Sequence, residues 1–171
     1  MSDRPYESFL RQQQREGQEL AAASDILSLA PESADPPSRY MALFNARGLV
    51  ESGSGKIEVF DFFTVQIWMP PDYLLKAEPA QVLTYLGPHP RPWHANIRPP
   101  FICLHLRPGT PLVSLLYALF ETWTWSLFAT RDDGLNRAAA QWARAQDPKR
   151  FPIDRRPLKR RRLNLEVTSQ P

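Results

Sequence analysis

The stretch KIEVFDFFTVQIWM, residues 56–69, alternates along much of its length between side chains on opposite sides of an extended chain. Phe63, Val65 and Ile67 fall on one side, because successive side chains of a β-strand point to opposite faces. The run is long enough for one bent strand or for two short ones. It predicts the centre of an antiparallel sheet that rests on a core.

Two further runs extend this sheet in both directions along the chain. RYMALFNARGLV, residues 39–50, precedes it across ESGSG, a glycine-containing stretch typical of a hairpin connection. AQVLTYL, residues 80–86, follows it and is predicted as another short strand. Strands that follow one another in the chain usually pair, so the runs together predict an antiparallel meander.

Helical patterns flank the predicted sheet on both sides. Residues 5–24 place apolar side chains on one face and Arg and Gln on the other. Residues 110–128 are predicted as a second helix with Thr110 as its N-cap, and residues 136–145 as a third with Asn136 as its N-cap. The predicted fold class is therefore α+β, with an N-terminal helix, one antiparallel meander sheet, a long loop and two C-terminal helices.

Length and composition favour one soluble domain with tails. The chain has 171 residues, of which 43% are hydrophobic, and its 18 prolines against 7 glycines indicate many rigid turns. The longest apolar stretch, residues 111–129, is interrupted by Ser, Thr and Glu and is too short to span a bilayer comfortably. No signal-peptide pattern is present, and the single cysteine fits a reducing compartment. We therefore expect a cytoplasmic protein without a membrane partner.

Basic residues concentrate near the C-terminus. KRFPIDRRPLKRRRL, residues 149–163, holds eight Lys or Arg and one Asp, whereas the whole chain carries a net charge of +3. This imbalance predicts a domain at residues 1–147 and a basic, flexible tail at residues 148–171. Binding of the tail to an acidic protein surface or to nucleic acid is an alternative. Nucleic acid is the less favoured partner, because aromatic and basic residues do not interleave on the predicted strands.

The only cysteine, Cys103, lies in a proline-rich, irregular stretch at residues 87–111, with His94, Asn96 and His105 close to it in sequence. Long irregular segments in compact domains are often functional. A buried structural cysteine is one interpretation, and a papain-like nucleophile beside a histidine is another. The chain has no resolving cysteine for redox chemistry, and Cys103 with both histidines would give zinc only three ligands. A thioester that carries an acyl group is a further interpretation, which needs an accessible thiol and an oxyanion donor.

Four motifs in this order resemble the ubiquitin-conjugating enzymes. HANI, residues 94–97, is similar to the family's His-Pro-Asn-Ile motif, and ICLH, residues 102–105, to its Ile-Cys-Leu-Asp motif around the thioester-forming cysteine. PPDYLLKAEPAQVLTYL, residues 70–86, resembles the proline-containing segment that precedes a strand in the family. DDGLNRAAAQW, residues 132–142, resembles its Asp-Asp-Pro-Leu-Asn segment and the short helix that follows. The resemblance covers residues 5–146 and implies a ubiquitin-conjugating-enzyme-like fold.

The resemblance implies a role for Cys103 and for several residues of the motifs around it. Cys103 would carry the C-terminal carboxyl group of a ubiquitin-like protein as a thioester. Asn96 would support the loop and donate to the oxyanion as a lysine attacks, and Asp133 would orient that lysine. His94 and Leu104 would have structural roles in the active-site loop. The implied partners are a ubiquitin-like protein, an activating enzyme and a protein target, with no cofactor and no metal.

The chain also departs from the family pattern. Ala95 and Leu74 stand where the family has proline, Gly134 replaces the proline of its Asp-Asp-Pro-Leu segment, and His105 replaces its aspartate. These departures indicate a divergent member, of the kind found in bacterial antiphage operons with a ubiquitin-like protein, an activating enzyme and a deconjugase. A non-catalytic scaffold of the same fold and a basic-tailed nucleic-acid-binding module are the alternative functions.

Overall fold

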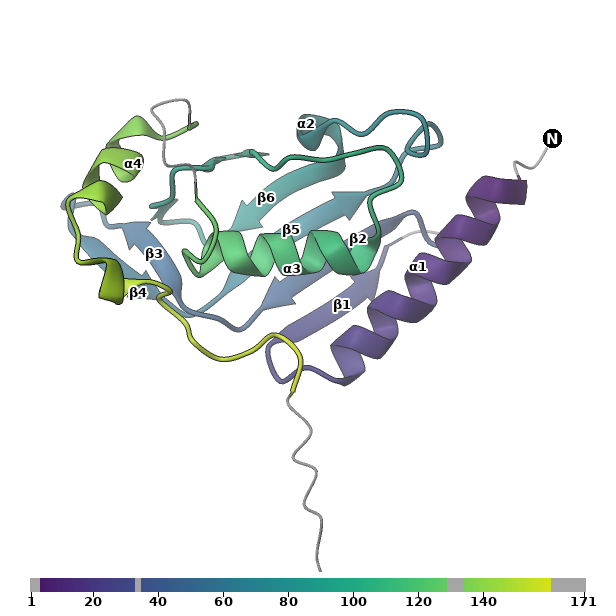
Figure 1. The fold of residues 1–171 in the computed structure, drawn as a ribbon, viewed down its shortest axis with the longest axis horizontal. Coiled ribbons are helices and arrows are strands. Elements are labelled where there is room, and N and C mark those ends of the chain that lie inside the picture. The colour runs from purple at the N-terminus through teal and green to yellow at the C-terminus, as the bar shows by residue number, and fades with distance from the viewer. Residues whose placement is uncertain (1–3, 33–34, 129–133, 161–171) are drawn as a thin grey trace, which may run out of the picture.

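The computed structural model describes residues 4–32, 35–128 and 134–160, and these form an α+β protein (Figure 1). An N-terminal helix, antiparallel strands and two C-terminal helices occur in the predicted order. The elements are α1 (Arg4–Ala22), β1 (Leu27–Pro31), β2 (Arg39–Phe44), β3 (Gly48–Glu51), β4 (Ile57–Phe60), β5 (Phe63–Trp68), α2 (Pro79–Val82), β6 (Leu83–Gly87), β7 (Arg91–Pro92), β8 (Ile97–Arg98), β9 (Phe101–Ile102), α3 (Leu112–Trp123), α4 (Arg137–Arg144) and the 3-10 helix η1 (Pro148–Arg150).

A four-stranded antiparallel sheet with the strand order β1-β2-β5-β6 forms the centre of the fold. Each of the three predicted runs contributes one strand to it. The alternation in β5 is as predicted, since Phe63, Val65 and Ile67 are fully buried. The remaining strands form a three-stranded sheet in the order β4-β3-β7 and the two-stranded β8-β9 hairpin. The prediction of a single sheet is therefore wrong.

The sheet is divided because two of the predicted runs bend in the middle. Between β2 and β3, the Ala46 carbonyl accepts a hydrogen bond from the Trp123 indole at 2.7 Å, and the Arg47 amide donates to Asp154 at 3.0 Å. Side chains, rather than a neighbouring strand, thus satisfy these backbone groups. The sequence pattern also does not predict β1, an edge strand that ends at Pro31, where a missing N–H is tolerated.

Helix α3 covers one face of the four-stranded sheet, and α1 lies alongside β1 and α3 (Figure 1). The Trp123 indole stacks on Phe63 of β5 with ring centroids 5.1 Å apart, and Phe120 lies 6.5 Å from Phe44 of β2. The main core is this interface between helix and sheet. Although α3 is apolar, none of the described helices combines the length and the apolar character that crossing a membrane requires.

The ends of α3 differ from the prediction. Its N-cap is Pro111, and the Thr110 hydroxyl instead bonds to the backbone of the turn before it. The first helical amide, at Leu112, donates to the side chain of Gln13, a buried residue of α1, at 2.8 Å. A side chain 99 residues away thus accepts the hydrogen bond that the side chain of a local N-cap residue usually accepts. The helix ends at Trp123, short of the predicted end at residue 128.

The C-terminal segment, residues 148–160, runs from α4 across the molecule to the end of α1 (Figure 1). Leu158 is buried in the main core, and Arg160 donates hydrogen bonds to carbonyl groups at and just after the end of α1. The prediction of a flexible tail from residue 148 therefore does not fit this segment. Residues 161–171 of the predicted tail lie outside the described residues.

Asp154 anchors the middle of the C-terminal segment. Its buried side chain accepts hydrogen bonds from the Arg47 amide at 3.0 Å and from the Arg156 guanidinium at 2.7 Å. Burial raises the pKa of Asp154, but the hydrogen bonds from Arg156 and Arg47 outweigh burial and lower the pKa to about 2. The carboxylate thus stays charged and paired, which is how a fold tolerates a buried acid.

Candidate active site

Cys103 and Asn96 lie side by side at the open end of the β8-β9 hairpin. The Cys103 amide donates to the Asn96 carbonyl at 2.8 Å, and the Asn96 Nδ2 donates to the Cys103 carbonyl at 3.1 Å. The Asn96 side chain therefore fixes the stretch of backbone that carries the thiol. The structure brings together the two residues that the sequence predicts as the working pair.

Exposure alternates along β9 and the residues that follow it. Ile102 and Leu104 are buried, with exposed fractions of 1% and 7%, whereas Phe101, Cys103 and His105 are exposed. The two buried side chains anchor the segment in the core, so the thiol lies on the solvent side of the chain. The interpretation of Cys103 as a buried structural cysteine is therefore wrong.

His94 is buried inside the same loop, with 1% of its surface exposed. Its Nδ1 accepts a hydrogen bond from the Asn96 amide at 3.0 Å, and its ring centroid lies 4.3 Å from that of Trp125. Burial lowers the pKa of His94 to about 3, and the Leu127 backbone opposes this shift only partly. His94 is thus a neutral imidazole near pH 7, which orders the backbone at Asn96 and is a poor base for the Cys103 thiol.

The pKa of His94 predicts that the protein loses stability in mild acid. The unfolded chain binds a proton at this imidazole near its ordinary pKa of 6.5, whereas the folded protein excludes that proton down to about pH 3. The contribution of the neutral His94 to the free energy of unfolding is therefore fully present above pH 6.5. It is lost progressively as the pH falls toward 3. Urea unfolding between about pH 7.5 and about pH 4 measures the effect. His94→Gln lacks the titrating group, so its unfolding free energy should fall less over this range, and equal slopes in the two proteins would contradict the prediction.

The start of α4 lies against the same loop. The Asn136 amide donates to the Ala95 carbonyl at 3.0 Å, and a Cβ added at Gly134 would lie 2.8 Å from that carbonyl oxygen. Glycine at this position thus permits two backbones to approach closely. As predicted, Asn136 caps α4, and its side chain accepts a hydrogen bond from the Ala139 amide. Asp133, the third predicted catalytic residue, lies outside the described residues.

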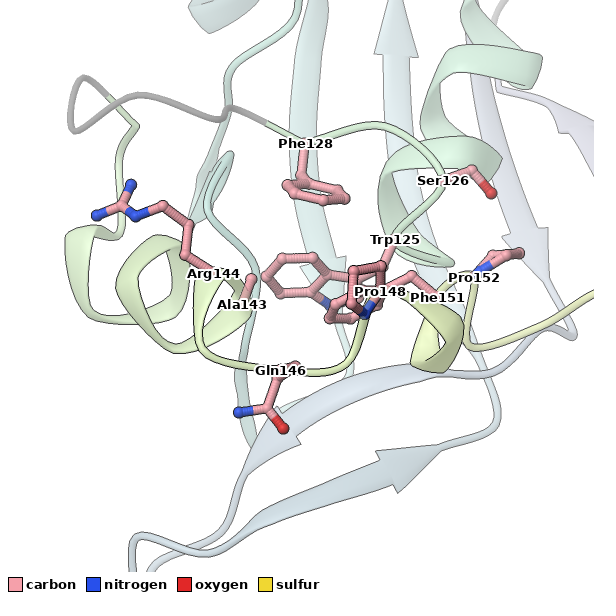
Figure 2. Close-up of a pocket in the computed structure, with 9 residues that line it drawn as sticks. All are labelled: Trp125, Ser126, Phe128, Ala143, Arg144, Gln146, Pro148, Phe151 and Pro152. Carbon is pink, nitrogen blue, oxygen red and sulfur yellow. The ribbon is translucent and has the colours of Figure 1, made fainter.

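An aromatic cluster packs against His94, and the sequence pattern does not predict it. The cluster consists of Trp93, Trp125, Phe128, Trp142 and Phe151, which come from separate parts of the chain. Three of its members, Trp125, Phe128 and Phe151, line an open cavity of about 430 Å³ that is also lined by prolines of the C-terminal segment (Figure 2). The only sequence signal for this cluster is the density of aromatic residues just after α3. That density does not show which distant aromatic residues pack against them.

These contacts present an exposed thiol on a backbone that is held by hydrogen bonds at both its amide and its carbonyl. Such a thiol can accept an acyl group from a thioester and pass it to an amine. Within the described residues, no three His, Cys, Asp or Glu side chains gather in a way that would hold a metal ion. Comparisons of the chain with family models, with curated proteins and with solved structures find no match.

Proposed function

We propose that this protein is a conjugating enzyme for a ubiquitin-like protein, with Cys103 as the residue that carries the thioester. One observation carries the proposal: Cys103 is exposed, while its amide and its carbonyl both form hydrogen bonds with Asn96. The two motifs that resemble the ubiquitin-conjugating enzymes, HANI and ICLH, are thus adjacent in space at an accessible thiol.

A third motif and the order of the elements support the same proposal. The Asn136 amide bonds to the Ala95 carbonyl, so the segment that resembles Asp-Asp-Pro-Leu-Asn reaches the HANI loop. The chain runs from a helix through an antiparallel sheet, with a helix across one face, and the cysteine-containing loop lies between the last strand of that sheet and α3. This order is the one expected of a ubiquitin-conjugating-enzyme-like fold.

The reaction divides into two acyl transfers. The Cys103 thiolate attacks the thioester carbon that joins the ubiquitin-like protein to its activating enzyme, a new C–S bond forms, and the activating enzyme's thiolate leaves. The amine of a target lysine then attacks the same carbon, a C–N bond forms, and the C–S bond to Cys103 breaks. The proton lost by the amine balances the charge on the departing Cys103 thiolate. Neither step consumes an oxidant or a reductant.

We place this reaction in a bacterial conjugation pathway that acts in antiphage defence. The chain is rich in arginine and proline and poor in lysine, a composition typical of bacteria with GC-rich genomes. An activating enzyme and a ubiquitin-like protein encoded beside the protein would supply its two upstream partners. The neighbouring genes are therefore the source of the partners for the experiment below.

The experiment incubates the protein with those two partners and ATP. We expect an adduct on a non-reducing gel that disappears when a thiol reductant is added. The control is the activating enzyme, which must first form its own thioester with the ubiquitin-like protein. Absence of an adduct with a pair that passes this control would overturn the proposed function.

Asn96→Ala is expected to slow transfer from charged Cys103 to free lysine by about tenfold or more. The variant removes the Nδ2 donor that fixes the Cys103 carbonyl, so the thioester carbon is held less accurately for attack. Asn96→Asp is the matched variant, since it keeps the size of the side chain and replaces the donor with an oxygen. Charging of Cys103 should change less, because it depends mainly on access to the thiol. Single-turnover discharge measures both variants, and wild-type rates in both would exclude this role.

A further inference from the structure

Trp125 adopts a backbone conformation that side-chain-bearing residues rarely take. Its φ is 63°, in the left-handed region, and among the described non-glycine residues it alone has a positive φ. A tryptophan in this region is strained and persists only where surrounding contacts hold it. Trp125 has only 1% of its surface exposed, so those contacts are extensive.

The contacts that hold Trp125 come from several directions. Its amide donates to the Thr122 carbonyl at 3.0 Å, and its indole Nε1 donates to the Trp93 carbonyl at 3.0 Å. Phe151 of the C-terminal segment stacks on the indole, with ring centroids 5.3 Å apart and an interplanar angle of 25°, and Phe128 also lies close (Figure 2). The indole is therefore fixed in position as well as in backbone conformation.

The fixed indole is connected to the thiol through a short series of contacts. Its ring lies 4.3 Å from that of His94, whose Nδ1 accepts the Asn96 amide at 3.0 Å. Asn96 in turn holds both the amide and the carbonyl of Cys103. The Nε1 bond to the Trp93 carbonyl secures the backbone immediately before His94. Trp125 thus contacts the loop at two points, one on its backbone and one on its imidazole.

We propose that Trp125 is a positioning residue for the loop that carries Asn96 and Cys103. Its strained backbone aims the indole at His94, and His94 holds the Asn96 amide, so the geometry around the thiol depends on a side chain that does not touch the reacting atoms. Nothing in the resemblance to ubiquitin-conjugating enzymes assigns a role to this position. The catalytic consequence rests on the proposed function, whereas the effect on the loop does not.

The experiment compares Trp125→Leu with Trp142→Leu in the full chain. Trp142 belongs to the same aromatic cluster, and its ring centroid lies 6.0 Å from that of Trp125. Its described ring contacts are with Trp93, Trp125 and Phe151 and with the Arg150 guanidinium, rather than with His94. Both variants lose an indole from one cluster, so thermal unfolding should show that both are destabilised. They differ in whether the lost indole contacts the His94 ring and donates to the Trp93 carbonyl, as only the Trp125 indole does among the described contacts.

Two measurements separate a positioning role from packing alone. In Trp125→Leu, hydrogen exchange at the Asn96 amide should be at least about tenfold faster, and discharge of charged Cys103 about tenfold slower. In Trp142→Leu both should stay within about twofold of wild type. Trp125→Phe keeps an aromatic ring beside His94 and should restore most of the Asn96 protection. Equal changes in the two leucine variants would overturn the inference.

Two further outcomes are also decisive. If Trp125→Leu does not fold, the methionine variants at the two positions are compared, because methionine adapts to an irregular gap but places no ring beside His94. Equal Asn96 exchange in the two methionine variants would overturn the inference. If the wild-type protein forms no thioester, the proposed function fails, and Asn96 exchange alone then decides whether Trp125 positions the loop. The two failures are therefore distinguishable.

Discussion

Cys103→Ala is expected to abolish the thiol-sensitive adduct between this protein and the ubiquitin-like protein, because it removes the only thiol of the chain. The side chain is exposed, so the unfolding free energy should change by less than about 0.5 kcal/mol. The loss of the adduct would then reflect chemistry rather than folding. Non-reducing gels measure the adduct, and urea unfolding of the same preparations measures stability.

Cys103→Ser separates the nucleophile from the shape of the site. A serine hydroxyl at this position can form an oxygen ester, which survives a thiol reductant, whereas the wild-type thioester does not. We therefore expect a weaker adduct that is resistant to reductant. An adduct that forms equally well in the alanine variant would place the acyl group on another residue and would contradict the assignment of Cys103.

Gly48→Ala is expected to lower the unfolding free energy by about 3 kcal/mol. An added Cβ would lie 2.2 Å from the indole ring of Trp123. That ring cannot retreat easily, since it stacks on Phe63 at 5.1 Å and donates a hydrogen bond to the Ala46 carbonyl at 2.7 Å. Close-packed interiors transmit such strain to the backbone. The melting temperature should fall by about 6–12 °C in a chain of this size.

Gly53→Ala is the matched control for this substitution. Gly53 lies in the turn between β3 and β4, and a Cβ added there meets no atom within 4 Å. The same chemical change should therefore alter the unfolding free energy by less than about 0.5 kcal/mol. Similar losses in the two variants would mean that the cost comes from removing glycine itself and not from the contact with Trp123.

Local patterns predict the elements of this fold better than they predict its connections. The alternation of Phe63, Val65 and Ile67 and the cap at Asn136 depend on neighbours within a few residues, and both are confirmed. The first amide of α3 donates instead to Gln13 on another helix, and the break after β2 depends on Trp123. No periodic pattern encodes a hydrogen bond between residues so far apart in the chain.

The same limit applies to the candidate site. The pairing of Asn96 with Cys103 follows from the resemblance to a family and not from the spacing of the residues alone. The backbone conformation of Trp125 has no sequence signal, because a positive φ at a tryptophan is a property of its surroundings. The charge of the C-terminal segment predicts a solvated stretch, yet Asp154 and Leu158 are buried, because Arg47 and the core provide their partners.

Because the C-terminal segment closes against the end of α1, the described fold can be completed only after residues 148–160 have left the ribosome. The Ser24 hydroxyl donates to the Leu158 carbonyl 134 residues later, and Arg160 donates to the Ala22 carbonyl 138 residues earlier. Contacts this distant in sequence form slowly, because the chain between them must first be ordered. Until residues 148–160 emerge, a nascent chain would expose the apolar site that Leu158 covers, and such surfaces are bound by chaperones.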